Sequence, residues 1–273
     1  MMQKQYKRVL SIAGSDPSGG AGIQADLKTF SACGCFGTTA IVAVVDENTV
    51  GVTDVHPIPV SFVTGQIKSV LDDIGADAIK IGMLHSSELI RAVKETLSAY
   101  PIKNIVLDPV MVATSGDSLL QKEAIDTLKH ELVPFVRVIT PNIPEAEILL
   151  GKEIKKQDEL PVFAKELSLG RKVSVLLKAG HLNDDELIDV FYNAETDETL
   201  HLHSARIYTQ NTHGTGCTLS SAIAAFLAHK NTLNEAVKKA KDYINNAIAA
   251  GSHYQIGKGK GPVHHFFDFW EGD

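Results

Sequence analysis

A glycine-rich loop that contains a cysteine carries the strongest signal for chemistry in this sequence. Residues 211–218 read NTHGTGCT and lead into the predicted helix 214–229. N–H groups at a helix start have no intrahelical partner, so this loop is predicted to bind an anion. Cys217 falls in the first turn, where the positive end of the helix dipole favours a thiolate. We therefore expect Cys217 to ionise more easily than a free cysteine and to serve as a general base. The alternative is a cysteine that only packs at a crowded helix start.

A second glycine-rich loop, 14–22, reads GSDPSGGAG and follows a predicted strand. Glycine allows the backbone to approach a ligand closely, and the helix that follows the loop presents free N–H groups. Asp16 and Ser18 can hydrogen-bond a polar substrate there. The spacing matches neither GxGxxG nor GxxxxGKS, so the two common nucleotide fingerprints are absent from this loop. A tight turn with an aspartate cap is the alternative interpretation.

A third loop, 140–145, reads TPNIPE and joins a predicted strand to a helix. Asn142 and Glu145 are three residues apart and can point the same way. A carboxylate and an amide near a phosphate site favour magnesium bound indirectly through water. The alternative is an N-cap asparagine with a capping-box glutamate.

Two more polar residues come at the ends of predicted strands. Asp108 follows the strand 104–107, and Lys178 ends the strand 173–178, where its charge could balance a phosphate. The carboxyl ends of parallel strands meet at one edge of a sheet, which is the edge where ligands bind. A loop cap and a solvated lysine are the respective alternatives.

The elements that must position these residues alternate as strand and helix. This order predicts an α/β fold with a mostly parallel central sheet, and strands that are apolar without alternation indicate helices on both faces. An antiparallel hairpin is predicted at 187–192 and 199–203, near a sheet edge. The other predicted strands are 8–13, 39–45, 78–81, 104–107, 136–140 and 173–178, and the predicted helices are 21–32, 61–72, 86–99, 122–131, 144–149, 159–167, 214–229 and 233–249.

Composition narrows the class of protein. The 273 residues carry a net charge of −7, which argues against a general nucleic-acid binder. The longest apolar run, 222–228, is too short to span a membrane, and we expect neither a membrane segment nor a signal peptide. Three cysteines without framework spacing predict free thiols and a cytoplasmic location.

No segment resembles a linker, so one domain is expected. The glycine-rich segment 257–261 is expected to be mobile, and the apolar FFDFW after it to dock on the fold.

Several segments together resemble the hydroxymethylpyrimidine/phosphomethylpyrimidine kinases of thiamine synthesis, which belong to the ribokinase-like superfamily. The resemblance covers nearly the whole chain, from about Val9 to the C-terminal tail. Most sugar kinases of the superfamily have an aspartate where this chain has Cys217. The matching segments are GSDPSGGAGIQADLKTF, KIGML, LDPVM, TPNIPEAE, LLKAGH, HGTGCTLSSAIAA and GKGKGPVHHF.

The resemblance implies one three-layer α/β/α domain over residues 1–273 that uses ATP and Mg²⁺ to phosphorylate a small pyrimidine and its monophosphate. It implies that Cys217 is the base and that the amides of Gly214, Thr215 and Gly216 stabilise the transferring phosphoryl group. A homodimer is left open. The implied pyrimidine pocket is Gly14, Asp16, Ala21, Val45, Glu47, Met83 and Val110; the nucleotide side is Asn142, Lys178 and Thr212; the metal side is Asp108 and Glu145.

One residue departs from the family pattern, and two other functions stay open. The family usually has glutamine in a Q-N-T motif that reads the pyrimidine edge, whereas this chain has Glu47. A carboxylate only accepts hydrogen bonds, so Glu47 could accept from the 4-amino group of the pyrimidine, but pairing with the adjacent ring nitrogen would then require one extra shared proton. A pyridoxal kinase of the same fold is the first alternative. A cysteine hydrolase or acyltransferase that pairs Cys217 with His213 is the remote one.

Overall fold

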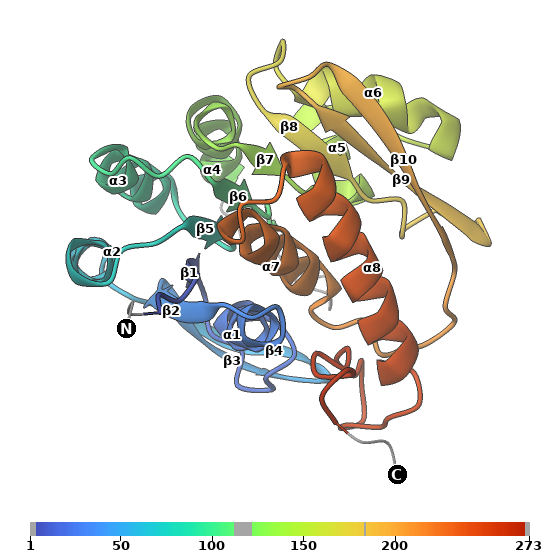
Figure 1. The fold of residues 1–273 in the computed structure, drawn as a ribbon, viewed down its shortest axis with the longest axis horizontal. Coiled ribbons are helices and arrows are strands. Elements are labelled where there is room, and N and C mark those ends of the chain that lie inside the picture. The colour runs from blue at the N-terminus through green and yellow to red at the C-terminus, as the bar shows by residue number, and fades with distance from the viewer. Residues whose placement is uncertain (1–3, 112–121, 183, 271–273) are drawn as a thin grey trace.

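The structure is a computed structural model and describes residues 4–111, 122–182 and 184–270. Its centre is a sheet of eight strands in the order β10-β9-β8-β7-β6-β5-β1-β2 (Figure 1). Pairing is parallel from β2 to β8 and antiparallel from β8 through β10, as the sequence predicts. The strands are β1 (Arg8–Ala13), β2 (Phe36–Ile41), β5 (Ala78–Ile81), β6 (Ile105–Leu107), β7 (Val138–Ile139), β8 (Ser174–Leu177), β9 (Glu186–Asn193) and β10 (Glu198–Ala205).

Helices cover both faces of this sheet, which confirms the three-layer α/β/α class (Figure 1). Successive strand residues point to opposite faces, so Val9 packs into one hydrophobic core and Leu10 into the other. One face carries α1 (Gly22–Ala32), α7 (Thr215–Ala228) and α8 (Leu233–Gly251). The other carries α2 (Val60–Asp73), α3 (Ser87–Ser98), α4 (Lys122–Thr127), α5 (Ile143–Leu150) and α6 (Leu160–Leu167).

A second, two-stranded sheet lies outside the main one, and the predicted strand 39–45 is therefore wrong. β3 (Ala43–Asn48) and β4 (Gly51–Pro57) pair as an antiparallel hairpin with a bulge between Asp46 and Glu47. The chain leaves the main sheet at Val42, whose N–H donates to the carbonyl of Ala13. No glycine or proline marks this break, so the β-branched run reads as one continuous strand.

Two other predicted elements are shorter than expected. The helix predicted at 122–131 ends as α4 at Thr127 and continues as a π-helical turn, Leu128–Leu132, and a 3₁₀ turn, Val133–Phe135. The strand predicted at 136–140 is reduced to the two residues of β7. Its end still delivers residues 140–145 to the same sheet edge as the other parallel strands.

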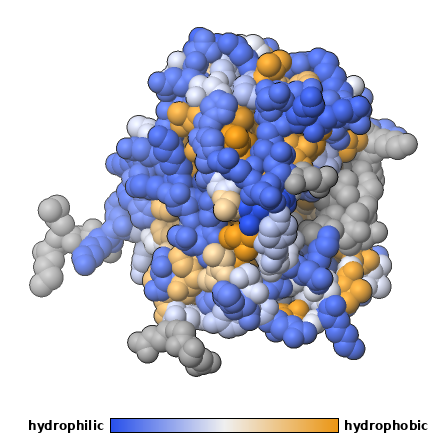
Figure 2. Space-filling view, turned by 90° about the vertical axis from the view of Figure 1, so that its right-hand side faces the viewer, coloured by the Kyte–Doolittle hydropathy of each residue, from blue (hydrophilic) through white to orange (hydrophobic). Residues whose placement is uncertain are grey.

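No helix in the described ranges combines the length and the apolar character that a membrane crossing requires. On the face shown in Figure 2, hydrophilic residues predominate and hydrophobic residues form small separate areas.

Candidate active site

One cavity of about 680 Å³ lies at the carboxyl ends of the parallel strands. All but one of the residues for which the sequence predicts a site role line this cavity, although they come from loops far apart in the chain; the exception is Ser18, which is not among the lining residues. The predicted residues that line it are Gly14, Asp16, Ala21, Val45, Glu47, Met83, Asp108, Val110, Asn142, Glu145, Lys178, Thr212, Gly214, Thr215, Gly216 and Cys217.

The two glycine-rich loops pack directly on one another at the start of α7. Gly214 is the N-cap of α7 with φ of 75°, and a Cβ there would lie 1.7 Å from the carbonyl oxygen of Gly20. Only glycine fits this position, because both the backbone angle and the contact exclude a side chain. No side chain caps the first turn of α7. The N–H of Thr215 donates to the carbonyl of Thr212 at 3.4 Å, and the start of the helix lines the cavity, where its positive end is suited to an anion.

The backbone of Gly216 faces two charged side chains across the cavity. A Cβ on Gly216 would lie 3.2 Å from Asp108 Oδ2 and 3.4 Å from Lys178 Nζ. Lys178 Nζ also lies 3.3 Å from Asp108 Oδ1, and the hydroxyl of Thr140 donates to the same oxygen at 2.9 Å. Asp108 Oδ2 is thus the carboxylate oxygen turned toward the anion-binding loop.

Asn142 and Glu145 form the capping box of α5, so the structural alternative for this pair is confirmed. Glu145 N–H donates to Asn142 Oδ1 at 3.0 Å, and Asn142 N–H donates to Glu145 Oε2 at 2.8 Å. Both residues nevertheless line the cavity. Burial raises the pKa of the Glu145 carboxyl, and the nearby charge of Lys178 opposes this effect.

Cys217 is half-buried in the first turn of α7, and the expectation that it ionises easily is wrong. Burial raises the pKa of its thiol to about 11. The Lys80 charge and the Gly22 N–H lower this pKa, while the charges of Asp26 and Asp108 raise it. Desolvation by the surrounding fold therefore outweighs the helix-end effect that the local sequence indicates.

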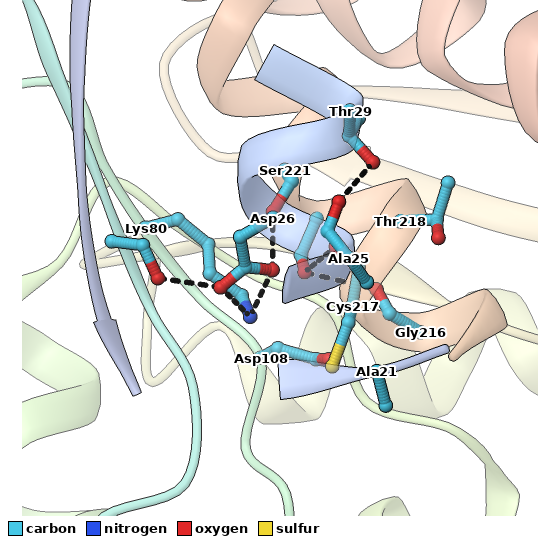
Figure 3. A network of polar contacts seen from close by, with 12 residues as sticks. Ala21, Ala25, Asp26, Thr29, Lys80, Asp108, Gly216, Cys217, Thr218 and Ser221 are labelled. Carbon is cyan, nitrogen blue, oxygen red and sulfur yellow. Dashed lines mark hydrogen bonds and ion pairs between the residues drawn. The ribbon is translucent and has the colours of Figure 1, made fainter. Parts of the chain in front are cut away.

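A buried polar network lies close to Cys217 (Figure 3). Lys80 Nζ donates to both carboxylate oxygens of Asp26, at 2.8 and 2.9 Å. The hydroxyls of Ser221 and Ser11 donate to Asp26 at 2.7 and 2.5 Å. Ser221 is one helical turn after Cys217 on α7, so the network and the cysteine share a helix. Sequence reasoning gave Lys80 no role, although a lysine inside the apolar strand β5 was a signal.

The other end of the cavity holds Asp16, His213 and Glu47. His213 Nε2 donates to Asp16 Oδ2 at 2.8 Å and lies 3.9 Å from Glu47 Oε1. Side-chain atoms that could bind a metal ion, one from each of the three residues, lie within 4.8 Å of one another. Asp16 also accepts backbone N–H groups from Ser18, Gly20 and Ala21, so its oxygens already have partners. This cluster forms the polar wall of the predicted substrate side.

The partners of His213 determine its charge and its orientation. Burial lowers its pKa, but the hydrogen bond and charge of Asp16 and the charge of Glu47 outweigh this, so the pKa is raised. In turn, burial opposes ionisation of Asp16, but hydrogen bonds from His213, Ser18 and Ala21 hold its pKa below the usual range. Within the described residues no hydrogen bond joins His213 to Cys217, and neither side chain affects the pKa of the other, so the thiol–imidazole contact of a cysteine hydrolase is not observed there.

The chain is similar to known kinases over most of its length. Residues 16–264 match the sequence model of the family described as phosphomethylpyrimidine kinase. The hydroxymethylpyrimidine/phosphomethylpyrimidine kinase of Salmonella typhimurium is 45% identical over 267 residues, which are 97% of this chain and 100% of that protein.

Solved structures show the same similarity. The phosphomethylpyrimidine kinase of Clostridium difficile has a TM-score of 0.77 and 41% identity, over 88% of this chain and 99% of that one. The pyridoxal kinase of Staphylococcus aureus, solved in complex with ADP, has a TM-score of 0.87 and 34% identity, over 97% and 96%. The ribokinase-like fold is thereby confirmed, and the chain belongs to the phosphomethylpyrimidine kinase family.

Proposed function

We propose that this protein transfers the γ-phosphoryl group of ATP to the hydroxyl of 4-amino-5-hydroxymethyl-2-methylpyrimidine and then to the resulting monophosphate, in the synthesis of thiamine diphosphate. The proposal rests on one observation: a single cavity is lined both by the start of α7, which is suited to phosphate, and by the polar cluster around His213 and Asp16, which is suited to a small ring. The names of the relatives, which cover both phosphorylations, support it.

In the first transfer, the substrate hydroxyl oxygen forms a bond to the γ-phosphorus while the bond from that phosphorus to ADP breaks. The hydroxyl proton passes to the thiolate of Cys217. The amides of Gly214, Thr215 and Gly216 bind the oxygens of the transferring group, and the charge of Lys178 offsets part of its negative charge. Because the thiol pKa is about 11, the thiolate is a minor form at neutral pH and a strong base when it forms.

The second transfer does not need Cys217 as a general base. A phosphate monoester has a second pKa of about 6 and is already largely ionised at neutral pH. Its oxygen can attack the γ-phosphorus without giving up a proton to the protein. The two reactions therefore share the anion-binding loop but differ in their need for a base.

The nucleotide and Mg²⁺ are assigned to the side of the cavity formed by the ends of β6, β7 and β8. Asn142, Lys178 and Thr212 are proposed for the nucleotide, and Asp108 and Glu145 for the metal. Asp108 Oδ2 faces Gly216, so a carboxylate oxygen is directed toward the place proposed for the γ-phosphate, which fits a divalent cation. When bound, Mg²⁺ neutralises charge on the phosphate oxygens.

The test is a coupled assay of ADP release with the hydroxymethylpyrimidine, its monophosphate and pyridoxal, with products identified by mass. We expect turnover of both pyrimidines, with pyridoxal at least tenfold lower in kcat/KM. ADP release with neither pyrimidine would contradict the proposal.

A pyridoxal kinase is the second candidate, and one observation favours it. The pyridoxal kinase of Staphylococcus aureus superposes over 97% of this chain with the TM-score given above. Pyridoxal has a phenolic oxygen and no exocyclic amine, so the acceptor-only carboxylate of Glu47 suits the aminopyrimidine better. The same assay decides between the two substrates.

Three other expectations remain predictions from the sequence. They are one domain over residues 1–273, a cytoplasmic location and, as an open possibility, a homodimer. Limited proteolysis tests the first, fractionation of cells the second, and analytical ultracentrifugation the third.

A further inference from the structure

The glycine-rich segment 257–261, expected to be mobile, makes a defined set of contacts with the tip of the β3–β4 hairpin. The carbonyl oxygen of Thr49 accepts the N–H of Lys260 at 2.8 Å. The hydroxyl oxygen of Thr49 accepts the N–H groups of Lys258 and Gly259, each at 3.2 Å. Thr49 is therefore held by three backbone N–H groups from one short segment.

These contacts explain why the segment is rich in glycine. A Cβ on Gly259 would lie 1.9 Å from the carbonyl oxygen of Thr49, and a Cβ on Gly257 would lie 2.2 Å from its hydroxyl oxygen. Gly257 also has φ of 69°, a conformation that other residues rarely adopt. The backbone of the segment presses so closely on Thr49 that a side chain at either position would push the hairpin away.

The segment is anchored to the rest of the fold on both sides. Before it, the Asn211 side chain donates to the carbonyl of Tyr254 at 2.6 Å. After it, His264 N–H donates to the carbonyl of Ala247 in α8 at 3.0 Å. Within it, the carbonyl of Gly261 accepts the N–H of His213 at 3.0 Å. One wall of the cavity, the loop with His213, is thus joined through 257–261 to another wall, the hairpin.

The hairpin depends on such contacts for its position. It pairs with no strand of the main sheet, and an isolated two-stranded ribbon is marginally stable in water. Its base is fixed to the Gly14 loop, where Ser15 N–H donates to Ala43 and Val45 N–H donates to the Ser15 hydroxyl. Its tip is fixed at Thr49. Glu47 lies between the two attachments, beside the bulge, and faces His213.

We propose that Thr49 is a positioning residue for the pyrimidine: held by the segment 257–261, it fixes the hairpin so that Glu47 stays at the substrate wall of the cavity. This proposal rests on the proposed function for its substrate. Thr49 itself does not line the cavity, whereas Lys260, whose N–H holds it, does. Thr49 lies at the tip of the hairpin that carries Glu47, so we expect loss of the attachment to act first on the pyrimidine side of the cavity.

Two variants of the full chain, Thr49→Val and Gly259→Ala, test the attachment, and each has its own control. Thr49→Val keeps the shape of the side chain and removes the hydroxyl acceptor, while Thr49→Ser keeps the acceptor and serves as the conservative rescue. Gly259→Ala places a Cβ against Thr49. Gly65→Ala in α2 is its matched control, because a Cβ there meets nothing within 4 Å.

The first readout needs no substrate and is hydrogen–deuterium exchange of the amides in residues 43–57. We expect faster exchange in Thr49→Val and Gly259→Ala, and native exchange in Thr49→Ser and Gly65→Ala. Unchanged exchange in both test variants overturns the attachment, whatever substrate the protein uses.

The second readout separates the two substrates. Thr49→Val should raise KM for the hydroxymethylpyrimidine about three- to tenfold, the range that corresponds to one neutral hydrogen bond, with KM for ATP and the melting temperature unchanged. Faster hairpin exchange with an unchanged pyrimidine KM overturns the positioning role. An equal rise in both KM values with a lower melting temperature also overturns it, because that pattern reports general destabilisation. If the native chain turns over neither pyrimidine, the proposed function fails while the exchange result still stands.

Discussion

Lys80 Nζ lies 2.8 and 2.9 Å from the two carboxylate oxygens of Asp26, and neither side chain is exposed to solvent. Moving two charges out of water costs several kcal/mol per ion, and their attraction repays this only with good geometry and further hydrogen bonds. Here Ser11 and Ser221 supply those bonds. The pair places a positive and a negative charge close to the thiol that we propose as the base: the Lys80 charge lowers the thiol pKa and the Asp26 charge raises it.

Removing one member of this pair should be costly. Lys80→Met leaves the Asp26 carboxylate buried without its counter-ion, and we expect a loss of about 3–5 kcal/mol in the free energy of unfolding. The double variant Lys80→Met, Asp26→Leu removes both charges and should lose much less. Urea unfolding of the three proteins measures this. A loss in the double variant as large as that in Lys80→Met would show that the unpaired Asp26 carboxylate is not what destabilises the single variant, and would contradict the prediction.

The pair His213–Asp16 should make stability depend on pH. The pKa of His213 is raised, so its contribution is complete below the unfolded value of about 6.5 and is lost as pH rises through the folded pKa. The pKa of Asp16 is lowered, so its contribution is present above about 3.9 and is lost as pH falls. The pair is therefore most stabilising between about pH 4 and 6.5.

Urea unfolding of the native chain and of His213→Gln at pH 5.5 and pH 9 tests this. The difference in free energy of unfolding should be larger at pH 5.5. A difference that does not change with pH would show that His213 is uncharged in the folded protein.

Local sequence was enough to find the loops of the site, because parallel strands deliver their carboxyl ends to one sheet edge whatever the details of packing. It was not enough where the partner is remote. The partner of His213 is Asp16, 197 positions away, and that of Lys80 is Asp26, 54 positions away. The direction of the Cys217 pKa shift was missed for the same reason, since desolvation depends on the tertiary fold and the helix end is local.

The hairpin that carries Glu47 was missed for another reason. The residues of β2 and β3 form one β-branched run, and Val42 between them gives no turn signal. The two strands part at Val42, whose N–H donates to the carbonyl of Ala13 and whose carbonyl accepts the N–H of Ile58. These contacts are tertiary and leave no mark on the local sequence. Glu47 nevertheless lines the cavity as predicted, because it was identified from its sequence motif and not from the strand prediction.

Glu47→Gln should bind the hydroxymethylpyrimidine as well as or better than the native chain. The amide supplies a donor and an acceptor to the ring edge, whereas the carboxylate only accepts. Glu47→Ala should weaken binding by about 1–3 kcal/mol, since the polar edge of the ring would be left unpaired. Calorimetry gives Kd for each variant. If neither substitution changes Kd, Glu47 does not contact the substrate.

Gly216→Val should abolish phosphoryl transfer with little effect on binding of the pyrimidine. The new Cβ would lie 3.2 Å from Asp108 Oδ2 and 3.4 Å from Lys178 Nζ, so the side chain fills the space assigned to the γ-phosphate. Calorimetric Kd for the pyrimidine is the control for folding. Native turnover in a folded variant would remove the anion-binding role from this loop.

The central claim is that Cys217 takes the proton of the substrate alcohol, and single-turnover rates for the two acceptors test it most directly. In Cys217→Ser, phosphorylation of the hydroxymethylpyrimidine should slow by about 10²- to 10⁴-fold, because the serine hydroxyl is a far weaker acid and supplies almost no base. Phosphorylation of the monophosphate should slow much less, since that acceptor is already ionised. A serine variant that phosphorylates the alcohol at nearly the native rate, or one that loses both reactions equally, would contradict the claim.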